Sequence, residues 1–369
     1  MYREHNNSTP GKDMRKTILH FIYNLGRGGA EVMMVKVIKE LKDYRNIIVT
    51  LTPENHFGDE LECDKYYCLN MKAILFFPAA AVQLKKIIKD NNVDIVHSHL
   101  FWPTIIARMG TPKNVTLVTT IHAFIANSIE YKTRYIRWLD KLTYRLRKNV
   151  IIAVAHGARE EYFEFLKLKP YKVYSLHTFV DIREFDHSRV AKTSPDRTVF
   201  KLVTVGALRE QKNHKYLIEA FNKLAGDNFQ LDIFGSGPLE KGMKAAIDKN
   251  NLSVQLKGEV RNIPEIINNY DLFVMSSTFE GFSLSVLEAM AMQMPLLLSD
   301  IRSFKEQCAD TAVYFDLNNQ EDFVSKLKSL AVDKEKLNCM GRRGKDRVHE
   351  NYTLERHMDG LRKIYLEVL

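Results

Sequence analysis

Two carboxylates stand in one stretch of the second half of the chain, where an apolar run ends in a glycine turn and a helical pattern begins. Glu280 falls on the predicted loop, and Glu288 falls about a turn and a half into the predicted helix. Carboxylates accept hydrogen bonds from vicinal hydroxyls, and the N–H groups at a helix start hold phosphate. The pair therefore suits a polyhydroxylated, phosphate-bearing ligand. The alternative is a capping carboxylate plus a carboxylate on the helix surface, and composition does not decide between the two.

Two cations, Arg209 and Lys212, lie in a second polar stretch over 206–214, between an apolar run and a helical pattern over 216–224. Cations that follow a strand and precede a helix suit a phosphate or a diphosphate. Arginine and lysine are also common on solvated loops. An ordinary strand-to-helix loop is therefore the alternative.

A third stretch, over 24–31, contains several glycines and precedes a predicted helix. Gly28 and Gly29 permit close backbone approach, and the helix start offers N–H groups to an anion. The stretch is not a dinucleotide-binding fingerprint, because the third glycine would fall at Glu31. A tight turn that binds nothing is the alternative.

Residues that could bind a metal are sparse. His97 and His99 share one face of a predicted strand, but no third ligand is evident from the sequence. We therefore interpret His99 as lining an acceptor cleft. The four cysteines lack the pairing of a zinc site, and no Asp-x-Asp pair, the common metal-bridging motif, occurs in the chain. We expect no metal.

Apolar, strand-like runs alternate with helical patterns along nearly the whole chain. The runs lie at 16–23, 46–51, 95–98, 117–121, 150–154 and 173–176, and then at 200–205, 230–234, 254–257, 272–276 and 295–299. This alternation, with strands that are apolar on both faces, indicates parallel sheets covered on both sides by helices. We predict an α/β fold of two tandem Rossmann-like, doubly wound domains that face a cleft, with ligands at the carboxyl ends of the strands.

The domain boundaries follow from an interruption of this pattern. Residues 186–198 are polar and contain a proline, which is typical of an interdomain linker. The predicted domains are 15–185 and 198–350. A closing helix over 353–369 is expected to cross back to the first domain.

Composition narrows the class of protein. The chain has 369 residues, of which 45% are hydrophobic and 27% charged, which excludes a disordered chain and a polytopic membrane protein. No signal peptide or disulfide framework is apparent, so we expect a cytoplasmic protein. Residues 1–180 carry 27 Lys/Arg and 17 Asp/Glu, whereas 181–369 carry 27 and 28. The basic first half favours an anionic partner there.

Much of that positive charge lies in a basic amphipathic helix predicted over 131–148, with seven Lys/Arg and one acid. Its apolar positions at helical spacing are Tyr135, Trp138, Leu139, Leu142 and Leu146. One interpretation is a surface helix packed by this apolar stripe. The other is a peripheral helix that docks on the anionic inner face of a membrane, near a lipid-linked acceptor. No nucleic-acid partner is expected, because no nucleic-acid-binding module is visible.

The chain resembles the family 4 glycosyltransferases in four motifs, which occur in the family's order and spacing from about residue 19 to 315. They are Gly28-Gly29-Ala30-Glu31, the stretch from Gly206 to Asn213, Gly235-Ser236-Gly237-Pro238-Leu239, and Glu280-Gly-Phe-Ser-Leu-Ser-Val-Leu-Glu288-Ala-Met-Ala. The last motif is highly specific, and the others support it. The resemblance implies the GT-B fold and retaining transfer from a nucleotide sugar.

The resemblance also implies roles for residues of the second half. Glu288 would bind the ribose hydroxyls of the nucleotide, and Glu280 would face the donor sugar. Lys212 and Arg209 would neutralise the diphosphate as it leaves. The other donor-binding residues that the family pattern implies are Gly206, Gly281, Phe282, Ser283, Leu284 and Ser285.

In the first half, His122 matches the family's histidine near the donor sugar and the reaction centre. Gly28 and Gly29 would bring backbone close to the diphosphate. Glu31 and His99 are expected on the acceptor side.

Two departures from the family pattern bear on these roles. The family often has arginine directly after the first glycine of the phosphate loop, whereas this chain has Ala207, and we expect Arg209 to reach the same phosphate. The family's Asn-Gly-Val-Asp near the domain junction is Thr178-Phe179-Val180-Asp181 here, which alters the predicted hinge.

The expected function is a retaining, metal-independent transfer of a hexose-type sugar from a UDP- or GDP-linked donor to a glycan or lipid-linked glycan, with no resident cofactor. Such transfers assemble capsule, exopolysaccharide or O-antigen. The favoured mechanism is front-face attack within an oxocarbenium-like ion pair. Two alternatives stay open: a nucleotide-sugar epimerase or hydrolase of the same fold, and a non-catalytic nucleotide-sugar-binding protein.

Overall fold

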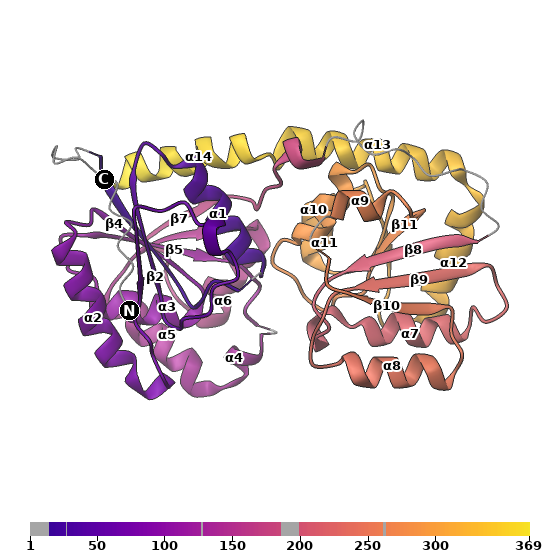
Figure 1. Cartoon of the computed structure of the whole chain (residues 1–369), viewed down its shortest axis with the longest axis horizontal. Helices are drawn as coiled ribbons and strands as arrows, with labels where there is room; N and C mark the ends of the chain where they lie inside the picture. Colours follow the sequence, from indigo (N-terminus) through magenta and orange to yellow (C-terminus); the bar gives the residue numbers. More distant parts are fainter. Residues whose placement is uncertain (1–14, 27, 127, 186–198, 261–262) are drawn as a thin grey trace. The chain divides into compact units, whose positions relative to one another are not determined.

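The computed structural model describes residues 15–369 except 27, 127, 186–198 and 261–262. The chain forms two compact units (Figure 1). Unit 1 contains the residues up to His177 together with His357–Leu369, and unit 2 contains Thr178–Arg356. The linker predicted over 186–198 lies outside the described residues.

A parallel seven-stranded sheet forms the centre of unit 1 as described, in the order β3-β2-β1-β4-β5-β6-β7. Its strands are β1 (Thr17–Ile22), β2 (Arg45–Thr50), β3 (Lys65–Cys68), β4 (Ile95–His99), β5 (Thr116–Ile121), β6 (Val150–Ala153) and β7 (Lys172–Ser175). The order reverses between β1 and β4. Carboxyl ends that flank such a reversal are where doubly wound sheets bind ligands.

Helices cover both faces of this sheet. They are α1 (Gly29–Glu40), α2 (Phe77–Asp90), α3 (Phe101–Gly110), α4 (Ile129–Lys132), α5 (Arg134–Leu146), α6 (His156–Leu166) and α14 (Leu354–Val368). Leu19 and Phe21 of β1 pack with α2 and α3 in one apolar cluster. Because side chains alternate along a strand, His20 projects to the opposite face, which α1 and α14 cover.

Unit 2, in the part that the structure describes, has a parallel six-stranded sheet in the order β10-β9-β8-β11-β12-β13. The strands are β8 (Phe200–Val205), β9 (Phe229–Phe234), β10 (Val254–Gly258), β11 (Leu272–Met275), β12 (Leu296–Ser299) and β13 (Val313–Phe315). The helices are α7 (His214–Asn222), α8 (Glu240–Lys249), α9 (Ile263–Ile267), α10 (Leu284–Ala291), α11 (Arg302–Cys308), α12 (Gln320–Val332) and α13 (Lys334–Asn351). Leu272 and Val274 of β11 join the apolar cluster formed with α7, α8 and α12.

The predicted α/β fold with two Rossmann-like units is confirmed, and each predicted strand is present. Two edge strands, β3 and β13, escaped prediction, because β3 is only half-buried and polar at its start and β13 has three residues. The predicted helix over 131–148 is divided in the structure, since the extended backbone of Thr133 separates α4 from α5. Among the described residues, no helix is long and apolar enough to cross a membrane.

The division between the units comes earlier than the boundary predicted at residue 185. Val180 pairs with Thr353 in a parallel bridge, and its N–H donates to the Tyr352 carbonyl oxygen at 2.9 Å. These contacts tie the Thr178-Phe179-Val180-Asp181 segment to unit 2. At the other end, α14 continues from unit 2 into unit 1 at His357.

Candidate functional site

At the carboxyl ends of the unit 2 strands, two predicted site residues of opposite charge, Lys212 and Glu280, form an ion pair. Lys212 Nζ lies 2.7 Å from Glu280 Oε1, and the side chains are only 16% and 7% exposed. Both are therefore largely withdrawn from water. This excludes the solvated-loop interpretation for Lys212 and the simple capping interpretation for Glu280, since the N-cap of α10 is Ser283.

Neighbouring side chains fix the Glu280 carboxylate further. The Ser277 hydroxyl donates to Oε1 at 2.7 Å, and the Gln211 amide lies 3.4 Å from Oε2 and donates to the Phe279 carbonyl at 3.0 Å. Burial with charge-assisted hydrogen bonds orients a carboxylate. Glu280 is therefore a pre-positioned acceptor: Oε1 already has two donors, whereas Oε2 has only the 3.4 Å contact with Gln211.

Two loops are locked together around this pair. The Ser276 hydroxyl lies 3.2 Å from the Lys212 carbonyl oxygen and 2.9 Å from that of Asn213, and the Thr278 N–H donates to the Gln211 carbonyl at 2.9 Å. The loop after β8 and the loop after β11 therefore form one body at the carboxyl ends of adjacent strands.

At this edge of the sheet, contacts with neighbouring atoms explain why positions 206 and 235 are glycine. A Cβ on Gly206 would lie 3.2 Å from Lys212 Cε and 3.3 Å from Cδ, so the glycine lets the lysine stem cross its backbone. Gly235 has φ +141°, and a Cβ there would lie 2.0 Å from the Gly206 carbonyl oxygen. The loop after β9 therefore supports the Gly206 loop through direct backbone contact.

Gln307 on α11 makes two hydrogen bonds with Ser283, the N-cap residue of α10. Its side-chain oxygen accepts from the Ser283 N–H at 3.0 Å, and its amide donates to the Ser283 carbonyl at 2.8 Å. The Ser283 hydroxyl lies 3.2 Å from that of Ser285, and no side chain caps the first turn of α10 in the described chain. The N–H groups of that turn are thus available to an anion.

The remaining predicted residues of unit 2 lie in α10 and in the loops that follow β8 and β11. Gly281 is buried, and Phe282 is buried and packs edge-to-face on Tyr352 with centroids 5.1 Å apart. Leu284 begins α10, and Glu288 is half-buried within it. The Arg209 side chain is exposed, immediately before the short 3-10 turn Glu210–Lys212.

His214, the first residue of α7, is a buried titratable group beside this loop. Burial, and secondarily the charge of Lys212, lower its pKa to about 4. The ring is therefore neutral near pH 7, and the positive charge of the loop resides on Lys212 and Arg209.

In unit 1, the structure joins two of the predicted histidines. His99 Nδ1 lies 3.0 Å from His122 Nε2, across the pair of strands β4 and β5. Burial, and then the neighbouring His357, lower the pKa of His122 to about 4. His99 is only 3% exposed, and its ring also stacks on that of His97 with centroids 4.4 Å apart.

Gly28 and Glu31 also lie together. A Cβ on Gly28 would be 2.5 Å from Glu31 Oε2, and Glu31 is buried in the first turn of α1. The carboxylate therefore folds back over the helix start and occupies space that the glycine leaves. Gly29 is exposed and begins α1.

Sequence reasoning missed the partners that hold the site: Ser277, Gln211 and Gln307. Gln211 is adjacent to Lys212 in the sequence, and Ser277 lies three residues before Glu280. This closeness in sequence could have marked both as candidate partners. Gln307 comes from a helix beyond the next strand, and nothing in the sequence connects it with Ser283.

Comparison with solved structures identifies the class of fold. The structure of HepE from Anabaena in complex with UDP and glucose superimposes with a TM-score of 0.82 at 14% identity, covering 95% of this chain and 100% of that chain. A glycosyltransferase from Rickettsia africae gives 0.78 at 20% identity, with 96% and 99% coverage. The fold is therefore that of the GT-B glycosyltransferases.

Sequence comparison then gives the family. Residues 27–184 match the model described as Glycosyltransferase Family 4, and 187–347 match the model described as Glycosyl transferases group 1. Together the two models span most of the chain, which belongs to the family 4 glycosyltransferases. The predicted resemblance is confirmed.

Two of the curated relatives that cover most of the chain have names that specify a substrate. One is the UDP-Gal:alpha-D-GlcNAc-diphosphoundecaprenol alpha-1,3-galactosyltransferase of Escherichia coli, 26% identical over 78% of this chain and 79% of its own length. The other is a Campylobacter jejuni N-acetylgalactosaminyltransferase that acts on a diphospho-undecaprenol-linked sugar, 25% identical over 85% of this chain and 89% of its own length.

Proposed function

We propose that this glycosyltransferase transfers a hexose-type sugar, with retention, from a UDP- or GDP-linked donor to a lipid-linked glycan. The observation that carries the proposal is the buried Lys212–Glu280 pair beside the uncapped start of α10. It combines a cation and helix N–H groups for a diphosphate with a carboxylate for sugar hydroxyls. Both requirements of a nucleotide sugar are present at one sheet edge.

The leaving group is stabilised by fixed protein groups in this proposal. An ammonium has three donors, and one N–H of Lys212 is directed to Glu280, which leaves donors for diphosphate oxygens. The sequence contains no Asp-x-Asp pair, so we assign charge neutralisation to Lys212, Arg209 and the N–H groups of α10. This supports transfer in which no metal ion neutralises the leaving diphosphate.

The proposed chemical step breaks the bond between the sugar C1 and the diphosphate oxygen, and the electron pair leaves with the nucleoside diphosphate. The acceptor oxygen bonds to C1 on the same face, and its proton passes to the departing phosphate. Glu280 is engaged by Lys212 and Ser277, which favours hydrogen bonding to the sugar over nucleophilic attack. Family resemblance adds roles for Glu288 at the ribose and for His122 near the sugar.

The acceptor assignment is supported by the two relatives named above, whose names specify diphosphoundecaprenol-linked sugars. The structure adds a surface suited to such an acceptor. Tyr135, Trp138 and Leu146 on α5 are 53%, 55% and 75% exposed, so the predicted apolar stripe is only partly packed. Tyr135 and Trp138 line a groove of about 650 Å³ together with Arg134, Arg137 and Lys141. We propose peripheral binding at the cytoplasmic face of an anionic membrane through this helix.

A thermal-shift titration with UDP, GDP and ADP tests the donor site. A ligand at a hundred times its Kd adds ~2.7 kcal/mol of stability. We expect one nucleotide to raise the midpoint of the wild type and of the exposed-surface control Glu240→Ala, but not of Glu288→Ala. No shift with any nucleotide at millimolar concentration would overturn the assignment.

Product analysis tests the reaction. Incubation with donor and an undecaprenyl-diphosphate-linked sugar should release free nucleoside diphosphate and give a product with the anomeric configuration of the donor. A product sugar still attached to nucleotide would indicate an epimerase. Donor cleavage without acceptor modification would indicate a hydrolase, and binding without any turnover a non-catalytic protein.

A further inference from the structure

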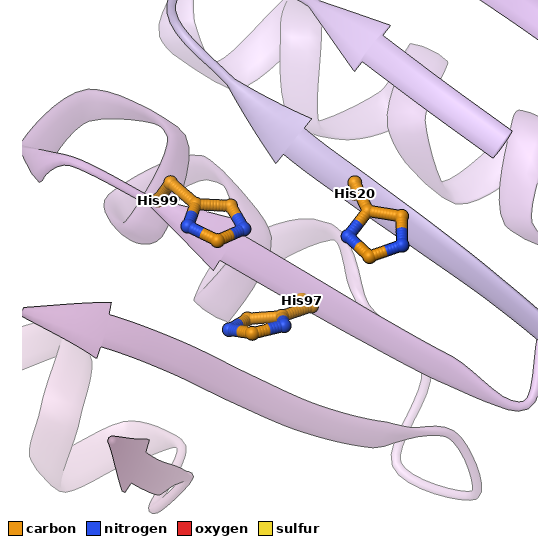
Figure 2. A group of neighbouring side chains, drawn as sticks. All are labelled: His20, His97 and His99. Carbon is orange, nitrogen blue, oxygen red and sulfur yellow. The ribbon is translucent and has the colours of Figure 1, made fainter. Parts of the chain in front are cut away.

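Three buried histidines from two adjacent strands meet on one face of the unit 1 sheet. His20 on β1 is in register with His97 on β4, and His99 follows on the same face. Their ring centroids are 4.4–6.4 Å apart, and each residue is at most 3% exposed. In Figure 2, the His20 and His99 rings each have a nitrogen that faces the other ring, and His97 lies beside the space between them.

The hydrogen bonds of Asn46 fix the tautomer of His20. The Asn46 side-chain amide nitrogen donates to the Leu41 carbonyl at 2.8 Å and to the Tyr44 carbonyl at 3.2 Å, so its oxygen faces His20 Nε2 at 3.2 Å. An amide oxygen only accepts, so Nε2 carries the proton. His20 Nδ1 is therefore a lone pair, buried and without a hydrogen-bond partner among the described residues.

His99 presents a second nitrogen to the same space. Its Nδ1 is paired with His122, whereas its Nε2 is buried without a hydrogen-bond partner in the described chain. The two His97 nitrogens are each paired with a hydroxyl: Nδ1 lies 2.6 Å from Tyr365 Oη and Nε2 lies 2.7 Å from Thr120 Oγ1. Because a hydroxyl either donates or accepts, one His97 nitrogen can become a lone pair without loss of the other contact.

We propose that His20, His97 and His99 bind one late first-row transition metal ion of the Zn²⁺ type. One ligand nitrogen from each ring lies within 4.8 Å of the other two. Tetrahedral zinc places imidazole nitrogens about 3.3 Å apart, given Zn–N bonds of about 2.0 Å, so small side-chain rotations complete the geometry. Three neutral histidines plus a water are a ligand set that zinc uses.

The surroundings fit one small ion. The histidines border an internal space of about 10 Å³, which Met33 and Met34 of α1 also line. A space of this size holds one water molecule, which would be the fourth ligand of an ion bound between the ring nitrogens. The second contact of His20, to the Asn46 oxygen, is the type of outer hydrogen bond that orients a metal-ligating histidine.

Metal binding would also set the tautomer of His122. A metal on His99 Nε2 leaves the proton of that ring on Nδ1, which then donates to His122 Nε2. His122 would consequently carry its own proton on Nδ1. His99 is thus a positioning residue for His122, and the metal site stands independently of the donor site in unit 2.

The test uses the full-length protein after EDTA treatment. We expect one equivalent of Zn²⁺ to bind, and Co²⁺ in its place to give the intense visible bands of a four-coordinate site. His20→Leu should weaken Zn²⁺ binding about 100-fold or more, because loss of a ligand exceeds the 10–100-fold effect of outer partners. The exposed His56→Gln serves as the matched control and should bind as the wild type does.

Crystals of the wild type soaked in Zn²⁺ keep the proposal testable if His20→Leu fails to fold. An anomalous peak within bonding distance of the three rings would support it. A water at that position with no anomalous signal would overturn it, and so would Zn²⁺ binding that is unchanged in a folded His20→Leu protein.

Discussion

Lys212 Nζ is 2.7 Å from Glu280 Oε1, and this buried ion pair joins the loops that follow β8 and β11. The two residues therefore have a structural as well as a proposed chemical role. A single substitution removes both roles together. Separating them requires substitution of both partners.

We expect Lys212→Met to reduce transfer about 10²–10³-fold, because a donor to the leaving diphosphate is lost. It should also lower the free energy of unfolding by about 3 kcal/mol, since the Glu280 charge stays buried without its partner. The double variant Lys212→Met/Glu280→Gln should regain most of that stability and none of the activity. Urea unfolding and initial rates provide the two readouts.

Recovery of activity in the double variant would contradict the proposed role of Lys212. Equal stability of the single and double variants would show that the ion pair contributes little to folding.

A second prediction concerns backbone contact between loops. Gly235→Ala places a Cβ 2.0 Å from the Gly206 carbonyl oxygen, so the Gly206 loop must shift. We expect nucleotide affinity to fall at least about tenfold, which is ~1.4 kcal/mol. Isothermal titration with the nucleotide identified above measures this. The control is Gly242→Ala on α8, where a Cβ meets no atom within 4 Å and helix propensity adds ~0.5–1 kcal/mol of stability.

Unchanged nucleotide affinity in Gly235→Ala would show that the Gly206 loop does not contact the ligand. A loss of affinity in Gly242→Ala as well would point to a general effect on unit 2.

The fold was accessible from the sequence because buried parallel strands are apolar on both faces and alternate with helices. The runs that became β1, β8 and β11 are of this kind. β3 escaped because a half-buried edge strand does not need a continuous apolar run. For α5, the apolar stripe was visible from its helical spacing in the sequence. Which of its residues are exposed depends on packing against neighbouring helices, and the sequence did not reveal that.

The site was only partly accessible, because residue types reveal chemistry and not partners. Glu280, Lys212 and Glu288 were singled out as candidates from their types and spacing, and the structure pairs Lys212 with Glu280. The Gln307 contacts with Ser283 and the His20 ring beside His99 arise from strand order, which brings distant segments together. The order of the strands within each sheet could not be predicted from the residue pattern alone.

Stability should fall on acidification, and His214 is one of the buried histidines that contribute to this effect. Its folded pKa of about 4 is below the ordinary 6.5, so the unfolded chain binds a proton more readily between these values. The contribution is complete above pH 6.5 and is lost as the pH falls toward 4, by up to about 3 kcal/mol. His214→Leu should therefore reduce the dependence of the thermal midpoint on pH between 7 and 4.5, and the other buried histidines, among them His20, His122 and His357, should account for the rest.

The exposed His56→Gln control should keep the wild-type slope. A His214→Leu protein with the same slope as the wild type would mean that His214 does not titrate in this range.

Gln307 should affect donor binding without touching the donor. Gln307→Leu removes both hydrogen bonds to Ser283 and leaves the start of α10 less fixed. We expect the donor KM to rise more than kcat falls, whereas the exposed Gln255→Leu should leave both unchanged. Steady-state kinetics decide the matter: a fall in kcat alone would place Gln307 in the chemical step.

Membrane binding is the last prediction, and it depends on the composition of the α5 surface. Trp138 and Tyr135 are exposed and stacked with centroids 6.0 Å apart, beside Arg134, Arg137 and Lys141. Aromatic rings enter the interfacial region, and each basic residue near an anionic surface contributes about 1 kcal/mol. We expect binding to vesicles that contain anionic phosphatidylglycerol but not to neutral phosphatidylcholine vesicles, and weaker binding at high salt.

The variants distinguish this surface from general stickiness. Trp138→Ser and Arg137→Gln should each reduce vesicle co-sedimentation several-fold, because one removes interfacial burial and the other removes charge. Tyr171→Ser is the matched control, since Tyr171 is 63% exposed on unit 1 and does not line the groove. Equal losses in all three variants, or equal binding to neutral vesicles, would show that α5 does not form the docking surface. Transfer to a short water-soluble acceptor should stay unchanged in Trp138→Ser, because the helix brings the enzyme to its substrate and takes no part in the chemistry.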